Sequence, residues 1–229
     1  MSGTTYFTPA LFKFLRDLNK NNNREWFQDN KPRYESEVRE PLLGFIEDFA
    51  PHLAKLSPHF VADPRKNGGS MFRIYRDTRF SKDKTPYKTH AAVQFRHDRA
   101  KDAHVPSFYL HLEPGSVFAA TGTWRPDSAS AKKIRDAIVA KPADWKRATS
   151  GKAVRALCTF DGHSLKRPPR GFDPEHPLIE DLKRKDFLAV AAFSQSDACG
   201  PGFMGQFAKF GRAVSPYTAF LTKALDLKY

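Results

Sequence analysis

Apolar residues in the N-terminal third of the chain recur at the three-to-four-residue spacing of an α-helix. In the first of these stripes, which ends at Leu18, Thr8 is placed to cap the helix and Pro9 occupies its first turn. Asn23 is placed to cap a second, shorter helix after a polar turn. Helices are therefore predicted over 8–18, 24–30 and 32–49, with a shorter piece between Pro51 and Pro58.

From residue 71 the pattern changes to short runs enriched in Phe, Val, Tyr and Ile. The separators between these runs carry Lys, Asp, Pro and Gly, and two of them are short enough for hairpins. This pattern favours an antiparallel meander. The predicted strands are 71–75, 91–97, 107–112 and 116–121.

Helical spacing returns in the C-terminal half and is interrupted by one basic loop rich in Pro and Gly, 164–173. Helices are predicted over 126–141 and 143–149, a strand over 186–193, and a long final helix over 203–227. The whole chain, 1–229, is thus predicted to be one α+β domain. Its mainly antiparallel meander sheet is expected to be covered by the N-terminal helices and the long C-terminal helix.

Composition excludes several classes of protein. No stretch approaches the roughly 18–20 apolar residues of a membrane span, and the N-terminus lacks the pattern of a signal peptide. Two cysteines, Cys158 and Cys199, do not make a disulfide framework and are expected to be buried free thiols. We therefore expect a cytoplasmic protein that does not bind membranes. Lys and Arg number 38 against 25 Asp and Glu, and this net charge of +13 attracts phosphates, nucleic acid or acidic surfaces.

The excess charge concentrates between Arg65 and His90, where eight basic residues accompany only two acids. Around a predicted turn, Arg76 and Arg79 are expected to converge on one oxyanion, with Asp77 and Asp83 as counter-charges. Arg73 is expected to point towards the covered face of a strand and to play a structural role. The segment 72–90 is therefore predicted to hold an anion, although a solvated basic loop is the alternative.

Aromatic residues near these cations suit a phosphate attached to a stackable base. Phe80 and Trp124 are interpreted as core residues, whereas Tyr87, flanked by polar residues, is the better candidate for contact with a ligand. Ligand-binding candidates in the segment are Arg73, Arg76, Arg79, Ser81, Lys82, Lys84, Tyr87 and Lys88, and the more distant contributors are Arg24, Arg135 and Arg170.

Several long motifs together resemble the DUF2461 family. They are FLRDLNKNNNREWFQDNKPRYE at 14–35, FRIYRDTRFSKDKTPYKTH at 72–90, GTW-P at 122–126, Ile134–Arg135, and PPRGFDPEHP at 168–177. The resemblance covers almost the whole chain and implies a single α+β domain. It implies little about activity, because the family is of unknown function.

Other motifs do not support a specific chemistry. The glycine-rich sequence at 200–205 lacks the second strand and acidic residue of a dinucleotide fold. The seven-residue spacing of His90, His97, His104 and His111 would place these residues on alternating faces of strands, so the sequence predicts no metal site and no cofactor.

Three functions remain open from the sequence. The first is a binding protein for a phosphate-bearing ligand, either a nucleotide or nucleic acid. The second is a hydrolase or transferase acting on a phosphorylated or other anionic substrate, with Asp77, Asp83, Tyr87 and His90 as catalytic candidates. The third is an adaptor for an acidic partner protein, which would show an exposed apolar patch beside the basic segment.

Overall fold

A computed structural model of the chain describes residues 3–99 and 105–229. Its centre is an antiparallel sheet with the strand order β1-β2-β3-β4-β6-β5. The strands are β1 (Phe60–Val61), β2 (Ala91–His97), β3 (Ser107–Glu113), β4 (Ser116–Thr123), β5 (Thr159–Asp161) and β6 (Phe187–Phe193). Strands β2, β3 and β4 form the predicted meander, and β6 returns to pair with β4.

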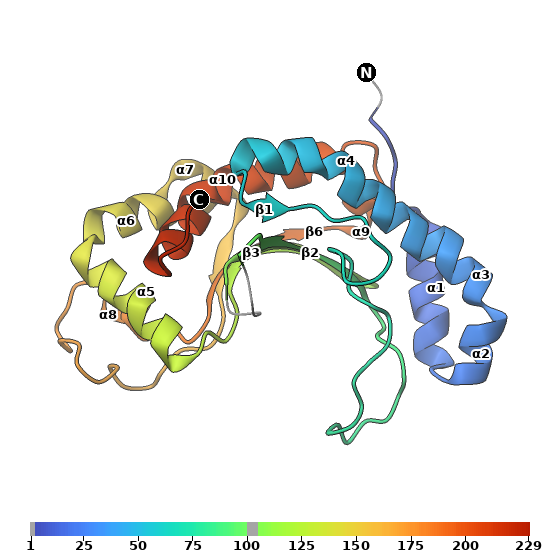
Figure 1. Cartoon of the computed structure of the whole chain (residues 1–229), viewed down its shortest axis with the longest axis horizontal. Coiled ribbons are helices and arrows are strands. Elements are labelled where there is room, and N and C mark those ends of the chain that lie inside the picture. The colour runs from blue at the N-terminus through green and yellow to red at the C-terminus, as the bar shows by residue number, and fades with distance from the viewer. Residues whose placement is uncertain (1–2, 100–104) are drawn as a thin grey trace.

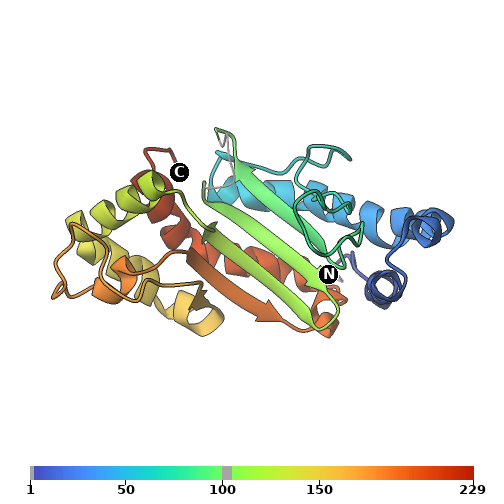
Figure 2. The ribbon, with the colours of Figure 1, turned by 90° about the horizontal axis from the view of Figure 1, so that it is seen from below.

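Two long helices cover one face of this curved sheet. Helices α4 (Glu40–Leu56) and α10 (Phe203–Ala224) cross its convex side, and the view from below shows them behind the strands (Figures 1 and 2). Alternate residues of β3, Phe108, Leu110 and Leu112, are fully buried on the helix side. In the described part of the chain no helix covers the opposite, concave face. We call this face of β2, β3, β4 and β6 the open face.

The N-terminal helices form one arm of the arch in Figure 1. They are α1 (Pro9–Lys20), α2 (Arg24–Asp29), α3 (Lys31–Tyr34) and the π-helical turn η1 (Glu35–Arg39). In α1 the predicted apolar stripe is buried, with Pro9 in the first turn. The break predicted at Pro51 is wrong, because α4 continues through this residue to Leu56. Pro51 is exposed on the solvent side of the helix.

Shorter helices and a long loop form the other arm. The helices are α5 (Ser128–Ala140), α6 (Pro142–Ser150), α7 (Lys152–Leu157), α8 (Ile179–Leu182) and α9 (Gln195–Ala198). The basic loop predicted at 164–173 lies at this end, far from segment 72–90 in both views (Figures 1 and 2).

The predicted strands at 91–97, 107–112, 116–121 and 186–193 are confirmed, but the strand predicted at 71–75 is wrong. Only single bridges form there, from Met71 to Val93 and from Tyr75 to Tyr87. Met71 packs against the core and Ile74 is buried within it, so side chains do not alternate between two faces as a strand requires. The segment leaves the sheet after two backbone hydrogen bonds to β2. Among the helices described, none is long and apolar enough to span a membrane.

Candidate functional site

Residues 74–88 form a loop with two paired arms, which we call the basic loop. The Arg76 amide donates to the Pro86 carbonyl over 2.9 Å, and the Lys88 amide donates to the Ile74 carbonyl over 2.8 Å. The arms place residues 77–85 at the tip and Lys88 at the root, beside β2. Figure 1 shows this teal segment projecting beneath the sheet, and in Figure 2 it lies between the sheet and the N-terminal helices.

The two predicted guanidinium forks do not converge on a common point. Arg79 pairs with Asp77, donating from Nε over 3.0 Å and from Nη2 over 2.7 Å. Arg76 donates to the Asp83 carboxylate and to the Thr85 hydroxyl. Each fork is therefore occupied by a carboxylate of the same loop, and these acids act as the counter-charges that the sequence suggested.

Hydrogen bonds lower the pKa of Asp77 and Asp83, the two acidic catalytic candidates. The hydrogen bonds from Arg79 lower the pKa of Asp77 to about 2. Hydrogen bonds from the Thr85 backbone and from Arg76 lower the pKa of Asp83 to about 2. Both carboxylates are thus ionised and weakly basic at neutral pH, far from the pKa that suits a general base.

The aromatic residues of this region are arranged opposite to the sequence interpretation. Tyr87 is only 2% exposed, and its ring stacks on Phe27 at 4.1 Å. Phe80, by contrast, is 95% exposed at the tip of the loop, and Trp124 is 57% exposed. Tyr87 therefore anchors the loop in the core, because Phe27 of α2 provides an apolar surface that its polar neighbours in sequence do not reveal. The exposed Phe80 is a single side chain rather than the patch that an adaptor would show.

The other predicted contacts at the tip are lysines and a hydroxyl close to solvent. Lys84 donates to the Thr78 carbonyl over 2.9 Å, whereas Lys82 is exposed and Ser81 is half-buried. These side chains remain able to contact a ligand, but none of them is oriented by a partner towards a shared point.

The three distant arginines are not brought together. Arg24 is exposed on α2 and lies near Tyr87. Burial raises the pKa of the Tyr87 hydroxyl overall, and the nearby Arg24 charge opposes this rise. Arg135 donates to the Leu182 and Arg184 carbonyls over 2.7 and 2.9 Å, so its guanidinium fastens the loop at α8. Arg170 lies exposed in the loop 164–173, at the opposite end of the molecule. Of the three, only Arg24 lies near segment 72–90.

A cavity of about 350 Å³ separates the root of the basic loop from α1. Its walls combine Asn19 and Asn22 with residues of the loop and its extension, Arg76, Asp83, Thr85, Tyr87, Lys88, Thr89 and His90. Asn22 closes one side, where its amide donates to the Tyr87 carbonyl and accepts from the Tyr87 amide, both over 3.0 Å.

Two cations flank the Phe72 ring at the edge of the open face, and a third, Arg73, is the next residue in the chain. The Lys88 ammonium lies 5.3 Å and the Arg96 guanidinium 5.7 Å from the centre of the Phe72 ring. Lys88 also donates to the Arg73 carbonyl over 2.8 Å. Burial, followed by the Arg73 charge, lowers the pKa of Lys88. We call Arg73, Lys88 and Arg96 the cation cluster.

The cation cluster contains no ion pair with a carboxylate in the part of the chain that the structure describes. Arg96 donates instead to the side-chain carbonyl of Gln94 over 2.9 Å. Arg73 is exposed rather than directed towards the covered face, which corrects the structural role expected for it. Arg96 was missed by sequence reasoning. Its place in strand 91–97, one residue from the buried Phe95, was the available signal, because alternation puts it on the open face.

Aromatic rings continue from the cation cluster across the open face, and we call them the aromatic row. Phe72 meets Tyr109 at 6.1 Å, and Tyr109 meets Phe118 at 5.8 Å. His111 stacks on Phe118 at 4.6 Å and lies 4.6 Å from His90. Phe72, Tyr109 and Phe118 are each partly exposed. The row thus combines stackable rings with unpaired positive charge.

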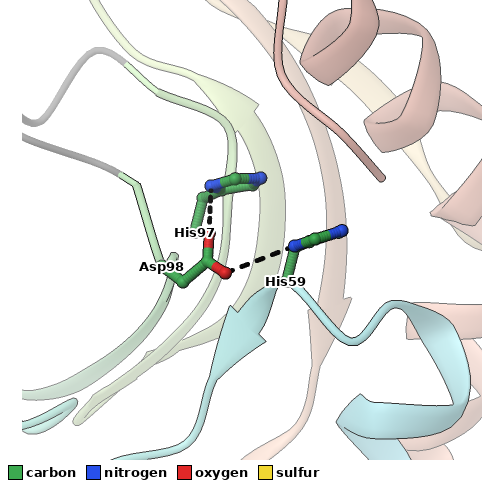
Figure 3. A group of neighbouring side chains, drawn as sticks. All are labelled: His59, His97 and Asp98. Atoms are coloured by element: carbon green, nitrogen blue, oxygen red, sulfur yellow. Dashed lines mark hydrogen bonds and ion pairs between the residues drawn. The ribbon is translucent and has the colours of Figure 1, made fainter.

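The histidines spaced by seven residues divide between two clusters, apart from His104, which lies outside the described residues. His90 and His111 join Glu113 at the cavity. His97 joins His59 and Asp98 at the far end of β2 (Figure 3). In this second cluster, His97 accepts from the Arg99 amide over 3.1 Å and lies 2.8 Å from the Lys228 carbonyl. Its two ring nitrogens are held by backbone, so the cluster ties the C-terminal end of the chain to the sheet.

The glycine-rich sequence at 200–205 and the two cysteines lie outside the cation cluster and the aromatic row. Residues 200–202 lie in the turn from α9 into α10 and 203–205 begin α10, so the motif does not follow a parallel strand. Cys158 and Cys199 are free and half-buried. Burial raises the pKa of both thiols, that of Cys158 to about 11, which disfavours the reactive thiolate.

The comparisons with known proteins agree with the resemblance seen in the motifs. A comparison with curated proteins gives no match. The family model described as a conserved hypothetical protein, DUF2461, matches residues 10–220, a range that includes the basic loop, the cation cluster and the aromatic row. The chain therefore belongs to the DUF2461 family.

Proposed function

We propose that this protein binds a phosphate-bearing ligand, a nucleotide or nucleic acid, on its open face. The observation that carries the proposal is the cation cluster. Lys88 and Arg96 flank the Phe72 ring, Arg73 follows Phe72 in the chain, and none of the three forms an ion pair with a described carboxylate. Like charges held this close repel each other, so a bound anion would lower the free energy of the arrangement.

The chemistry of the neighbouring groups narrows the class of ligand. Guanidinium and ammonium groups bind phosphate oxygens, and Phe72, Tyr109 and Phe118 offer rings on which bases can stack. This moves the predicted anion site from the tip of the basic loop to its root, since Arg76 and Arg79 are already paired with acids. Among the catalytic candidates, His90 lies in the cavity wall beside this root.

Fluorescence anisotropy with a labelled single-stranded oligonucleotide, and competition by mononucleotides, test the proposal over a series of salt concentrations. We expect affinity to fall steeply with salt, and Arg96→Ala to weaken binding by about tenfold and to lower the salt slope by about one. Arg79→Ala is the matched control. It removes the same charge from the same region, but from a guanidinium that pairs with Asp77, and we expect less than about a twofold change.

Two results would contradict the proposal. If the protein does not bind the oligonucleotide at low salt, the proposal is wrong. Equal losses in Arg96→Ala and Arg79→Ala would show that the oligonucleotide responds to net charge and not to the cation cluster.

A further inference from the structure

Two imidazoles and a carboxylate meet where the cavity reaches the sheet. One donor atom from each of His90, His111 and Glu113 lies within 4.8 Å of the others. His111 and Glu113 are two residues apart on β3 and share its open face. His90 immediately precedes β2, whose Ala92 pairs with His111. Strand register therefore brings the three side chains together, although 21 residues separate the histidines in sequence.

His90 has no hydrogen-bond partner for its ring nitrogens among the described residues. Its half-buried ring forms part of the cavity wall, 4.6 Å from the His111 ring. A neutral ring directs a lone pair from one nitrogen, and such a partly buried polar atom is normally satisfied by a partner.

Both ring nitrogens of His111 lie within hydrogen-bonding distance of a neighbouring side chain. Its Nδ1 lies 2.9 Å from the Tyr109 hydroxyl, and its Nε2 lies 3.1 Å from the Glu113 carboxylate. A hydroxyl can donate or accept, so Tyr109 suits either tautomer of His111. Without a cation, Nε2–H donates to Glu113. With a cation on Nε2, the ring adopts the other neutral tautomer: Nε2 releases its proton to solvent, Nδ1 takes up a proton from solvent, and the resulting Nδ1–H donates to the Tyr109 hydroxyl.

We propose that His90, His111 and Glu113 bind a divalent transition-metal ion whose remaining coordination positions open into the cavity. Imidazole with one carboxylate suits Zn²⁺, Co²⁺, Ni²⁺ or Fe²⁺, whereas Mg²⁺ and Ca²⁺ prefer sets of oxygen ligands. Ligands of a bound ion stand roughly 3–3.5 Å apart, so small rotations of side chains around the present positions complete the site. Three protein ligands and an open position also characterise metal sites that bind a further ligand.

The cluster of His59, His97 and Asp98 offers the same types of donor but a different environment. A cation at its His97 Nδ1 would have to displace the Arg99 amide, which already donates to that nitrogen over 3.1 Å. This cluster therefore provides a matched control within the same chain.

Titration of the metal-free protein with Co²⁺, followed by visible absorption and by calorimetry in buffer without phosphate, tests the site. We expect a Co²⁺ spectrum that Zn²⁺ displaces and that Mg²⁺ does not. His90→Gln and Glu113→Gln should weaken binding at least tenfold, and Tyr109→Phe roughly tenfold, whereas His59→Gln should bind like the wild type. Circular dichroism shows whether each variant keeps its fold. If His90→Gln does not fold, Glu113→Gln provides the test instead, because Glu113 lies at the partly exposed end of β3.

The proposal fails if the wild type binds neither Co²⁺ nor Zn²⁺, or if His59→Gln loses the ion while His90→Gln keeps it. It does not rest on the proposed function, since no phosphate-bearing ligand is present in the titration. Failure of oligonucleotide binding would leave this result unchanged, and the two outcomes are therefore separate.

Discussion

The pairing of Asn22 with the backbone of Tyr87 holds the basic loop against the N-terminal helices, and its removal gives a sharp test of this arrangement. Both hydrogen bonds are 3.0 Å long and join residues 65 positions apart in the chain. Asn22→Ala deletes both bonds at once. It leaves the Tyr87 amide and carbonyl facing the cavity with no side chain to bond them.

The decrease in the free energy of unfolding caused by Asn22→Ala can be estimated from these two hydrogen bonds. An intramolecular hydrogen bond contributes about 0.5–1.5 kcal/mol net, and a group left unsatisfied costs about 1–3 kcal/mol. Water in the cavity can reach the two Tyr87 groups, so we expect the lower range to apply, about 2 kcal/mol in total. For a domain of this size, that loss lowers the midpoint of thermal unfolding by roughly 4–8 °C.

Urea denaturation and scanning calorimetry measure this effect, with Asn21→Ala as the matched control. Asn21 is exposed and donates only to the Asp17 carbonyl of its own helix, over 2.9 Å, so its loss should cost about 0.5 kcal/mol or less. The reasoning is refuted if Asn22→Ala is no less stable than Asn21→Ala, since the contact between loop and helices would then carry no free energy.

Three further substitutions separate structural from surface roles. Burial alone would raise the pKa of Asp186, but amide donation from His163 and Arg125 lowers it overall, and Asp186→Asn should cost about 1–3 kcal/mol at pH 7 in urea denaturation. Because the folded pKa is the lower one, this contribution is present above the unfolded value of about 3.9 and is lost as pH falls through the folded pKa, so the two proteins should converge in acid. Gly122→Ala should destabilise by several kcal/mol in the same assay, because φ is 122° and a Cβ would collide with the β6 backbone. Phe80→Ala should change the thermal midpoint by less than about 1–2 °C, because the ring is 95% exposed.

Elements with a strong local pattern could be predicted from the sequence, and elements that depend on distant partners could not. The meander strands and α1 each carry an uninterrupted hydrophobic period that matches their buried faces. Strand β1 has only two residues, and β5 has three. Both exist because a longer neighbour supplies the hydrogen-bonding edge, and that information lies in the neighbour's sequence.

Sequence reasoning places the candidate site in segment 72–90, but it reveals the ion pairs and ring contacts within that segment only in part. The pair of Asp77 and Arg79 is local, since an aspartate accepts from an amide two residues on in a common turn. The contact of Arg96 with Phe72 depends on residues 70–72 following the edge of β2, which a motif does not encode. Tyr87 is buried for a similar reason, because its apolar partner Phe27 lies 60 residues earlier in the chain.

The distribution of charge links the two proposals for the open face. At the tip of the basic loop, Asp77 and Asp83 offset two arginines and leave Lys82 and Lys84, whereas the three cations of the cation cluster at the root have no described carboxylate partner. The same cations repel a metal ion at His90 and His111, where Glu113 supplies the one described carboxylate of the proposed site. A bound phosphate would reduce that repulsion and could occupy the open coordination positions. Because coupling between two binding sites is reciprocal, metal and phosphate should then strengthen each other's binding by the same factor.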